Sequence, residues 1–145
     1  MSLEAELAEL AERERRALAM GGEAKLARRR AAGVLNARAR IDHFLDPDSF
    51  FESGLLGVSS VVEADRDRTP GDGKLTGFGR VDGRPVAVAS NDFTVKGASS
   101  SLTNMKKIGH VKRVATERGF PLVFFGESSG ARMPDNMGAR GMGAL

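Results

Sequence analysis

The spacing of apolar residues changes along the chain and separates a helical first third from a mixed remainder. Leucine and alanine recur on one side of residues 3–20, with glutamate and arginine elsewhere, which predicts an amphipathic helix that the glycine pair at 21–22 ends. A second helical pattern extends over residues 23–45, and Pro47 stops it. Asn36 can instead cap a separate short helix, which would split this second stretch in two.

From residue 50 onward, short apolar runs alternate with turn residues, which is typical of strands. We expect a strand near residues 58–62, and a surface loop over the charged, Pro/Gly-rich residues 65–73. Residues 75–81 and 84–93 flank an Asp-Gly dipeptide at 82–83, which favours a tight hairpin turn.

The last part of the chain predicts a helix followed by a buried strand. The small residues 97–101 form a loop whose serines can cap a helix that ends at Gly119. Residues 121–125 are an apolar run too short for a helix and ended by glycine, as expected of a buried strand. Another helix is expected after Arg132. The order of elements predicts an α/β layer fold.

Two parts follow from this order. Residues 1–48 form an N-terminal helical segment, and residues 49–145 form the first part of an α/β domain. The final residues, 138–145, are apolar and glycine-rich and have no polar tail, so we expect the domain to be incomplete at this end.

Composition narrows the class of protein. The 145 residues are 41% hydrophobic and 28% charged, with no cysteine, no run long enough to cross a bilayer, and no secretory leader pattern. A disulfide framework and a thiolate nucleophile are therefore excluded, and cytoplasm is the expected location. The net charge is +3, with many Lys and Arg side chains in residues 13–40, but the lack of Tyr and Trp makes nucleic acid an unlikely partner.

The most informative segment follows the last strand. Residues 126–130 match the G-x-S-x-G pattern of serine hydrolases, but that chemistry needs an acid and then a histidine later in the chain. The histidines are His43 and His110, both upstream, so the triad order fails. No phosphate-binding P-loop occurs, and no His or acidic spacing predicts a metal site.

The turn at residues 128–132 and the loop at residues 91–98 each follow a predicted strand and consist of residues that bring backbone amides close to a ligand. Together they could surround a thioester oxygen, where each donor to a developing enolate is worth about 3–4 kcal/mol. From the residues alone, ordinary strand-to-helix connections explain both loops equally well.

Several ordered motifs resemble one family. They are residues 32–42 with 45–52, then Lys74 to Val88, Asn91-Asp92-Phe93-Thr94-Val95, Lys106-Lys107-Ile108 and Glu127 to Pro134. From about residue 20 to its end the chain resembles carboxyltransferase (beta) subunits of biotin-dependent acyl-CoA carboxylases, of the propionyl-CoA and methylcrotonyl-CoA type. Members of that family are several times longer, so the resemblance covers only the first part of their first half.

The resemblance implies a partial crotonase-type (ClpP/crotonase) fold of stacked β-β-α units preceded by N-terminal helices. It implies an enzyme component that binds acyl-CoA and stabilises its thioester enolate for carboxylation by carboxybiotin carried on a partner protein. By resemblance the catalytic amides belong to Ser129, Gly130 and Ala131, and contacts to coenzyme A or the structure of its site are expected from Gly97, Ala98, Lys106, Lys107 and Arg132. Ser129 replaces a glycine of the family pattern, and Val34 replaces a common lysine.

The implied partners are a biotin carboxyl carrier or biotin carboxylase subunit, and the remaining carboxyltransferase portion or other copies in an oligomer. We expect no turnover from this chain alone. A non-catalytic scaffold subunit and an acyl-CoA decarboxylase of the same family are the alternatives, and a nucleic-acid binder using residues 13–40 is a third.

Overall fold

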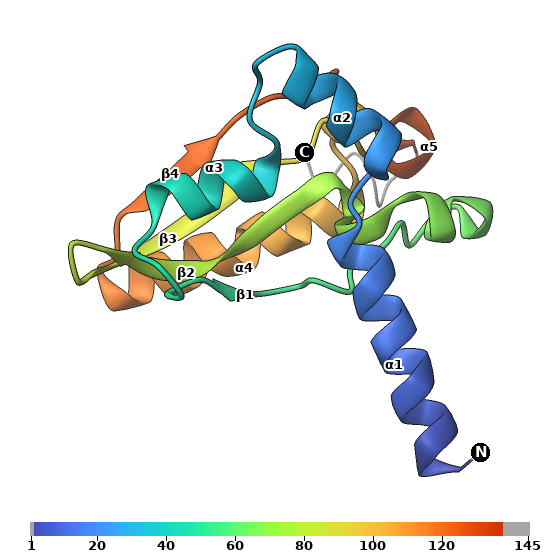
Figure 1. Cartoon of the computed structure of the whole chain (residues 1–145), viewed down its shortest axis with the longest axis horizontal. Coiled ribbons are helices and arrows are strands. Elements are labelled where there is room, and N and C mark those ends of the chain that lie inside the picture. Colours follow the sequence, from blue (N-terminus) through green and yellow to red (C-terminus); the bar gives the residue numbers. More distant parts are fainter. Residues whose placement is uncertain (1, 138–145) are drawn as a thin grey trace.

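The computed structural model describes residues 2–137, so the glycine-rich end from Gly138 to Leu145 lies outside the described residues. Its centre is a four-stranded sheet with helices on both faces (Figure 1). The elements, in chain order, are α1 (Leu3–Leu18), α2 (Glu23–Ala31), α3 (Ala37–Phe44), β1 (Phe51–Glu52), η1 (Glu63–Arg68), η2 (Pro70–Gly73), β2 (Lys74–Val81), β3 (Arg84–Asn91), η3 (Lys96–Ala98), α4 (Leu102–Arg118), β4 (Leu122–Phe125) and α5 (Met133–Asn136).

The sheet has the order β1-β2-β3-β4, antiparallel except for the parallel pair β3 and β4. Asp82 and Gly83 connect β2 to β3 with φ of 50° and 75°, the two left-handed residues that a tight hairpin turn needs. α4 then crosses over from β3 to β4, which makes one β-β-α unit and starts the next. Both the predicted hairpin and the predicted crossover are confirmed.

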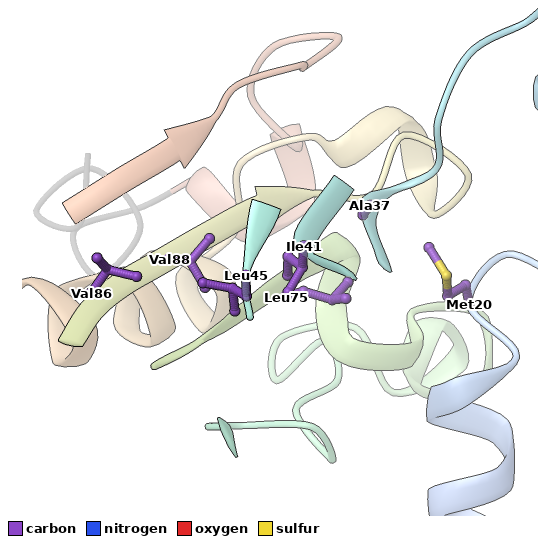
Figure 2. Packing of buried hydrophobic residues seen from close by; sticks show 7 residues of the cluster. All are labelled: Met20, Ala37, Ile41, Leu45, Leu75, Val86 and Val88. Atoms are coloured by element: carbon purple, nitrogen blue, oxygen red, sulfur yellow. The ribbon is translucent and has the colours of Figure 1, made fainter. Parts of the chain in front are cut away.

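Alternation along β3 divides the core between the two faces of the sheet. Val86 and Val88 point toward α3, whereas Ala87 faces α4 with Val111 and Ala115. On the first side lies a cluster that we call the α3 core, drawn in Figure 2: Met20, Ala37, Ile41, Leu45, Leu75, Val86 and Val88.

Caps set the ends of the helices as the sequence predicts. Asn36 accepts a hydrogen bond from the backbone N–H of Ala39 at 2.9 Å, so the stretch after residue 23 is two helices, α2 and α3, rather than one. Ser101 caps α4 in a reciprocal arrangement with Asn104, and Gly119 ends it with φ of 69°.

Two expectations for the segment between α3 and β2 are wrong. Residues 58–62 form no strand, because Ser59 is buried and its N–H donates to the Thr69 hydroxyl at 2.9 Å rather than to a neighbouring strand. The short strand β1 forms earlier and pairs with β2. The segment at 65–73 is not a plain surface loop either, since it forms η1 and η2 and buries Asp72 completely.

The expected buried strand exists as β4, but it is only partly buried, and Phe124 is 47% exposed. Within the described sheet β4 pairs only with β3, so it is an edge strand. No helix among residues 2–137 is long and apolar enough to traverse a bilayer.

Candidate active site

The two loops that the sequence singled out meet at one edge of the sheet. β3 and β4 run parallel, so their carboxyl ends lie together, and the chain leaves each strand through one of these loops. Ser100 and Ala131 form an isolated parallel bridge between them, in which Ser100 N–H donates to Gly130 O and Arg132 N–H donates to Ser100 O, each at 2.8 Å. The expectation that the loops act as a pair thus has a structural basis.

Gly97 is the point where the two loops come closest. Its carbonyl accepts the Ser129 N–H at 2.9 Å, and the next carbonyl, that of Ala98, accepts the Ser128 hydroxyl at 3.1 Å. A Cβ on Gly97 would lie 2.6 Å from Ser129 Oγ, and φ here is 61°. A larger residue at 97 would therefore have to displace the Ser129 side chain and adopt a strained backbone conformation.

The three predicted oxyanion donors differ in what their amides do. Ser129 N–H is bonded to Gly97 O, and Gly130 N–H donates to the Ser128 hydroxyl at 3.1 Å. The hydrogen bonds of residues 2–137 include none from the N–H of Ala131, nor any from the N–H of Gly97. Each loop therefore carries one amide without an internal acceptor in the described part of the chain.

The two predicted lysines, adjacent in sequence, have opposite environments. Lys106 is exposed on α4. Lys107 is buried, and its ammonium donates to the carbonyl oxygens of Gly71, at 2.7 Å, and of Lys74. Burial lowers the pKa of Lys107 to about 8. This placement gives Lys107 a structural role and does not support the expected contact with coenzyme A.

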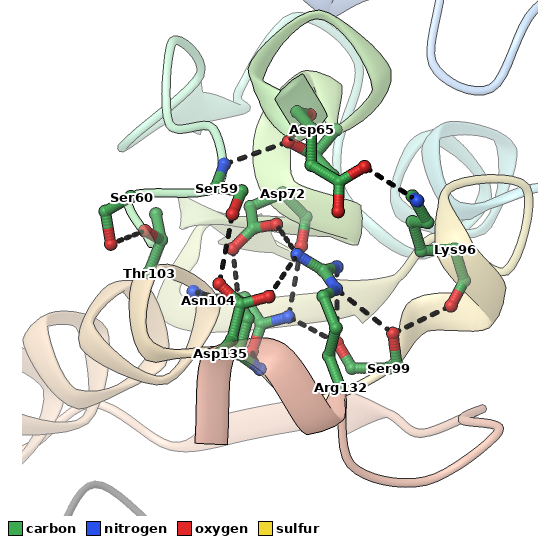
Figure 3. A network of polar contacts seen from close by, with 12 residues as sticks. Ser59, Ser60, Asp65, Asp72, Lys96, Ser99, Thr103, Asn104, Arg132 and Asp135 are labelled. Atoms are coloured by element: carbon green, nitrogen blue, oxygen red, sulfur yellow. Dashed lines mark hydrogen bonds and ion pairs between the residues drawn. The ribbon is translucent and has the colours of Figure 1, made fainter. Parts of the chain in front are cut away.

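Arg132 is also buried and forms the centre of a network beneath the turn (Figure 3). Its Nη1 donates to Asp72 Oδ1 at 2.5 Å and lies 3.5 Å from Asp135 Oδ2, while Nε donates to the Ser99 hydroxyl at 3.3 Å. The guanidinium thus holds the turn in place, and of the two expectations for Arg132, site structure and phosphate contact, the geometry supports the first.

Asp72 connects this network to two other elements. It lies in η2 with φ of 47°, between two glycines that are also left-handed, and this turn points its carboxylate inward. Ser101, the N-cap of α4, bonds the second carboxylate oxygen. We call the buried polar side chains joined in this way the polar cluster: Ser59, Asp72, Ser99, Ser101, Asn104, Arg132 and Asp135.

Glu127, the first charged residue after β4, ties the N-terminal helices to the site. Arg29 of α2 and Arg40 of α3 donate to its carboxylate at 2.7 and 2.6 Å. Partial burial acts to raise the pKa of Glu127, but these two hydrogen bonds outweigh it and the pKa lies below its usual value. Its carbonyl also accepts the side-chain amide of Asn91 at 2.8 Å, which links the ends of β3 and β4.

We call residues 128–132, which carry the predicted oxyanion donors, the donor turn. It lies on an open surface, since Ser128 to Ala131 are exposed. A shallow cavity of about 430 Å³ lies elsewhere, between α1 and residues 55–71. Among residues 2–137, no group of three or more His, Cys, Asp or Glu side chains could hold a metal ion.

The sequence of this chain is similar to those of known carboxyl transferases. Residues 28–144 match the Carboxyl transferase domain. The carboxyltransferase subunit of propionyl-CoA carboxylase from Haloferax mediterranei is 37% identical over 143 residues, which are 97% of this chain and 28% of that protein. The propionyl-CoA carboxylase beta chain of Saccharopolyspora erythraea is 41% identical over 138 residues, covering 94% of this chain and 25% of that protein.

A solved structure gives the same result. Transcarboxylase 12S, determined with methylmalonyl-coenzyme A and methylmalonic acid bound, superposes with a TM-score of 0.86 at 34% identity, over 99% of this chain and 28% of that one. The crotonase-type fold is thereby confirmed. The chain spans about a quarter of the length of the curated relatives that it matches. The family match, the similar relatives and the superposition all agree. This chain belongs to the carboxyl transferase family.

Proposed function

We propose that this chain is the acyl-CoA-binding part of a carboxyltransferase and that it stabilises a thioester enolate. The observation that carries the proposal is the pair of loops at the carboxyl ends of β3 and β4, each with an amide that has no acceptor among residues 2–137, at Gly97 and Ala131. Loss of the α proton of an acyl thioester puts negative charge on its oxygen. Fixed amide donors aimed at such an oxygen lower the barrier, each by about 3–4 kcal/mol.

The three predicted donors then contribute unequally. Ala131 can donate as it stands. The Gly130 amide becomes free when the exposed Ser128 side chain rotates, which also breaks the Ser128 hydroxyl bond to the Ala98 carbonyl. Release of the Ser129 amide requires the loops to separate, because its acceptor is the backbone of Gly97. Lys106, exposed on α4, is available for a phosphate of coenzyme A, and Ala98 contributes backbone shape.

The carboxyl group comes from another protein in this proposal. Carboxybiotin, carried on a biotin carboxyl carrier subunit, supplies the CO2 that the enolate captures. The described residues do not fit a biotin attachment site, because the lysine pair lies within α4, with Lys107 buried and bonded to two carbonyls. This chain's own part is to bind the acyl-CoA and to hold charge on its oxygen.

The remaining carboxyltransferase portion, or another copy, is the second proposed partner. The donor turn is exposed, and the apolar Phe124 of β4 is half exposed, so both surfaces are free to be covered. We therefore expect this chain to bind ligand weakly and to give no carboxylation when it is the only carboxyltransferase component. Turnover by the chain alone would contradict that part of the proposal.

Titration with propionyl-CoA by calorimetry tests the proposal, with two variants of the turn. Ala131→Pro removes the N–H without adding a long side chain, and neither bridge hydrogen bond uses that N–H, so binding should weaken about tenfold or more. The matched variant Ser128→Ala removes the internal acceptor of the Gly130 amide together with the hydroxyl bond to the Ala98 carbonyl. The backbone bonds from Ser129 N–H to Gly97 O and from Ser100 N–H to Gly130 O still join the loops, so binding should be retained. Absence of binding by the unchanged chain would favour the scaffold alternative.

A further inference from the structure

Helix α1 carries a row of leucines that faces away from the rest of the molecule. Leu3, Leu7 and Leu10 are 71%, 56% and 40% exposed; one turn further along the same face is the exposed Glu14, and Leu18 follows it. The spacing of three and four residues places the first three on one face of the helix. Figure 1 shows α1 extending away from the sheet, with the N-terminus at its far end.

Only the second half of α1 lies near the described body of the protein, where it lines the cavity shared with residues 55–71. Only Ala17, in its last turn, is buried, and Arg16 forms an ion pair with Asp67 at 3.2 Å. At 16 residues α1 is only slightly longer than the roughly 12–15 residues below which an isolated helix is marginal in water, and most helical stability in proteins comes from packing an apolar face. The leucine row therefore needs a surface to cover it.

The charges of α1 indicate what that surface is. The first half of the helix is acidic, whereas arginines appear only from residue 13 onward. Glu12 is paired within the helix to Arg15 and Arg16 at 2.7 and 2.8 Å. Glu6 and Arg13 lie two turns apart on the same flank of the leucine row, and neither forms an ion pair with any of residues 2–137.

We propose that α1 docks against α1 of a second copy of this chain in antiparallel orientation. This arrangement brings the Glu6 carboxylate of each copy to Arg13 of the other and places Leu7 and Leu10 of both copies at the centre. A parallel pair would instead place Glu6 beside Glu6. The proposal rests on α1 alone and does not depend on the function proposed for the loops.

The absence of cysteine from the chain makes a direct geometric test possible. The midpoint between Glu6 and Arg13 lies beside Leu10, so two Leu10→Cys side chains should meet and form an intermolecular disulfide under mild oxidation. Two Leu3→Cys side chains would be about 20 Å apart in the antiparallel pair, too far to bridge. Ala8→Cys, on the far side of the helix, is the matched control and should not bridge either.

Charge exchange tests the same pairing without new covalent bonds. Glu6→Arg and Arg13→Glu, each alone, should weaken self-association in sedimentation by about tenfold, because each creates two like-charged contacts per dimer. The double variant should restore it. Equal disulfide formation by Leu3→Cys and Leu10→Cys would establish a parallel pair. If no disulfide forms, or if the double charge variant does not restore self-association, something other than a second α1 covers the leucine row. Each of these results overturns the proposal.

Discussion

The α3 core and the polar cluster are both buried, but opposite kinds of interaction hold them together. The first is a set of aliphatic side chains, such as Ile41 and Val88, that pack across the sheet without direction. In the second, the Arg132 guanidinium donates directed hydrogen bonds to the Asp72 carboxylate and the Ser99 hydroxyl, and the Asp135 carboxylate lies 3.5 Å away as a second counter-charge. The α3 core stabilises the sheet, and the polar cluster fixes the loops that carry the proposed donors.

The two regions should respond differently to substitution. Aliphatic packing loses stability in proportion to the volume removed, so its damage is graded. A buried ion pair loses much more when one partner goes, because the other charge stays buried without compensation. Variants in the two regions should therefore differ in the size and in the additivity of their effects.

The largest effect is expected from Arg132→Met. It leaves Asp72 and Asp135, which are almost completely buried, without a counter-charge, and should lower the free energy of unfolding by about 3–5 kcal/mol. Urea denaturation measures it. Arg113→Met is the control, since Arg113 pairs with Glu117 on the exposed face of α4, and it should change stability by less than about 1 kcal/mol.

The double variant Asp72→Leu with Arg132→Met sharpens this result. If the pair acts as a unit, the double variant should be less unstable than the sum of the two single variants, because no charge is left unpaired between these two positions. Additive losses would mean that Asp72 and Arg132 act independently.

Ile41→Ala tests the α3 core and should lower the free energy of unfolding by about 3 kcal/mol. Ile41 is fully buried, and its replacement leaves a cavity against Leu75 and Val88. Ile41→Val should lower it by only about 1 kcal/mol, which would show the graded response. Equal losses from both variants would argue against simple packing in this core.

Lys107 and Lys106 give a comparison that depends on pH. The pKa of Lys107 is about 8 in the folded protein and near the ordinary lysine value of 10.5 in the unfolded chain, so between these values the unfolded chain binds more protons. The free energy of unfolding should therefore rise between pH 8 and 10.5, by about 2–3 kcal/mol from this group.

Removal of the buried amine should remove most of that rise. Lys107→Met should flatten the curve across this interval except for a smaller rise from Lys74, whose pKa burial also lowers, whereas Lys106→Met should keep its shape, because Lys106 is exposed. The chain contains no tyrosine or cysteine to titrate in the same range. Matching curves for the two variants would show that the Lys107 ammonium is not buried as described.

The contrast between the two regions also explains what the sequence could predict. Local signals were reliable: the Asp-Gly turn, the caps at Asn36 and Ser101, and the glycine that ends α4 all act within a few residues. The α3 core follows from periodicity, since Ile41 and Leu45 are one helical turn apart.

The polar cluster could not be found in this way. Asp72 stands in a charged, glycine-rich stretch that is typical of a surface loop, and its partner Arg132 is 60 residues away. No local pattern states that two such residues pair. The prediction of a strand at 58–62 failed for the same reason, because Ser59 is held by Thr69 and by Asp135, 76 residues away.

The candidate site was only partly predictable. The sequence indicated the correct two loops, because glycine and small residues after strands mark close backbone turns. It could not show which amides have internal acceptors, since a bond such as Ser129 N–H to Gly97 O depends on how the loops meet. Lys107 was a missed signal: it lies one helical turn before the predicted core residue Val111, so the period of α4 favoured burial, whereas the resemblance led to an expected contact with coenzyme A.

The two helix caps give the smallest and most direct comparison, because one lies in each region. Asn36 caps α3 by a single bond to Ala39 N–H, and Asn36→Ala should lower the free energy of unfolding by about 1 kcal/mol. Ser101 accepts the Asn104 N–H in the same manner but also bonds the buried carboxylate of Asp72. Ser101→Ala should therefore lower it by about 2–3 kcal/mol, the sum of a lost cap and an unsatisfied buried acceptor.

Thermal and urea unfolding of both variants would measure this difference of about 1–2 kcal/mol. If Ser101→Ala costs no more than Asn36→Ala, the Asp72 carboxylate gains nothing from Ser101, and the polar cluster would then consist of separate contacts rather than one connected unit. A larger loss for Ser101→Ala that disappears when Asp72 is already replaced by leucine would show the opposite: the cap of α4 and the ion pair under the donor turn support each other.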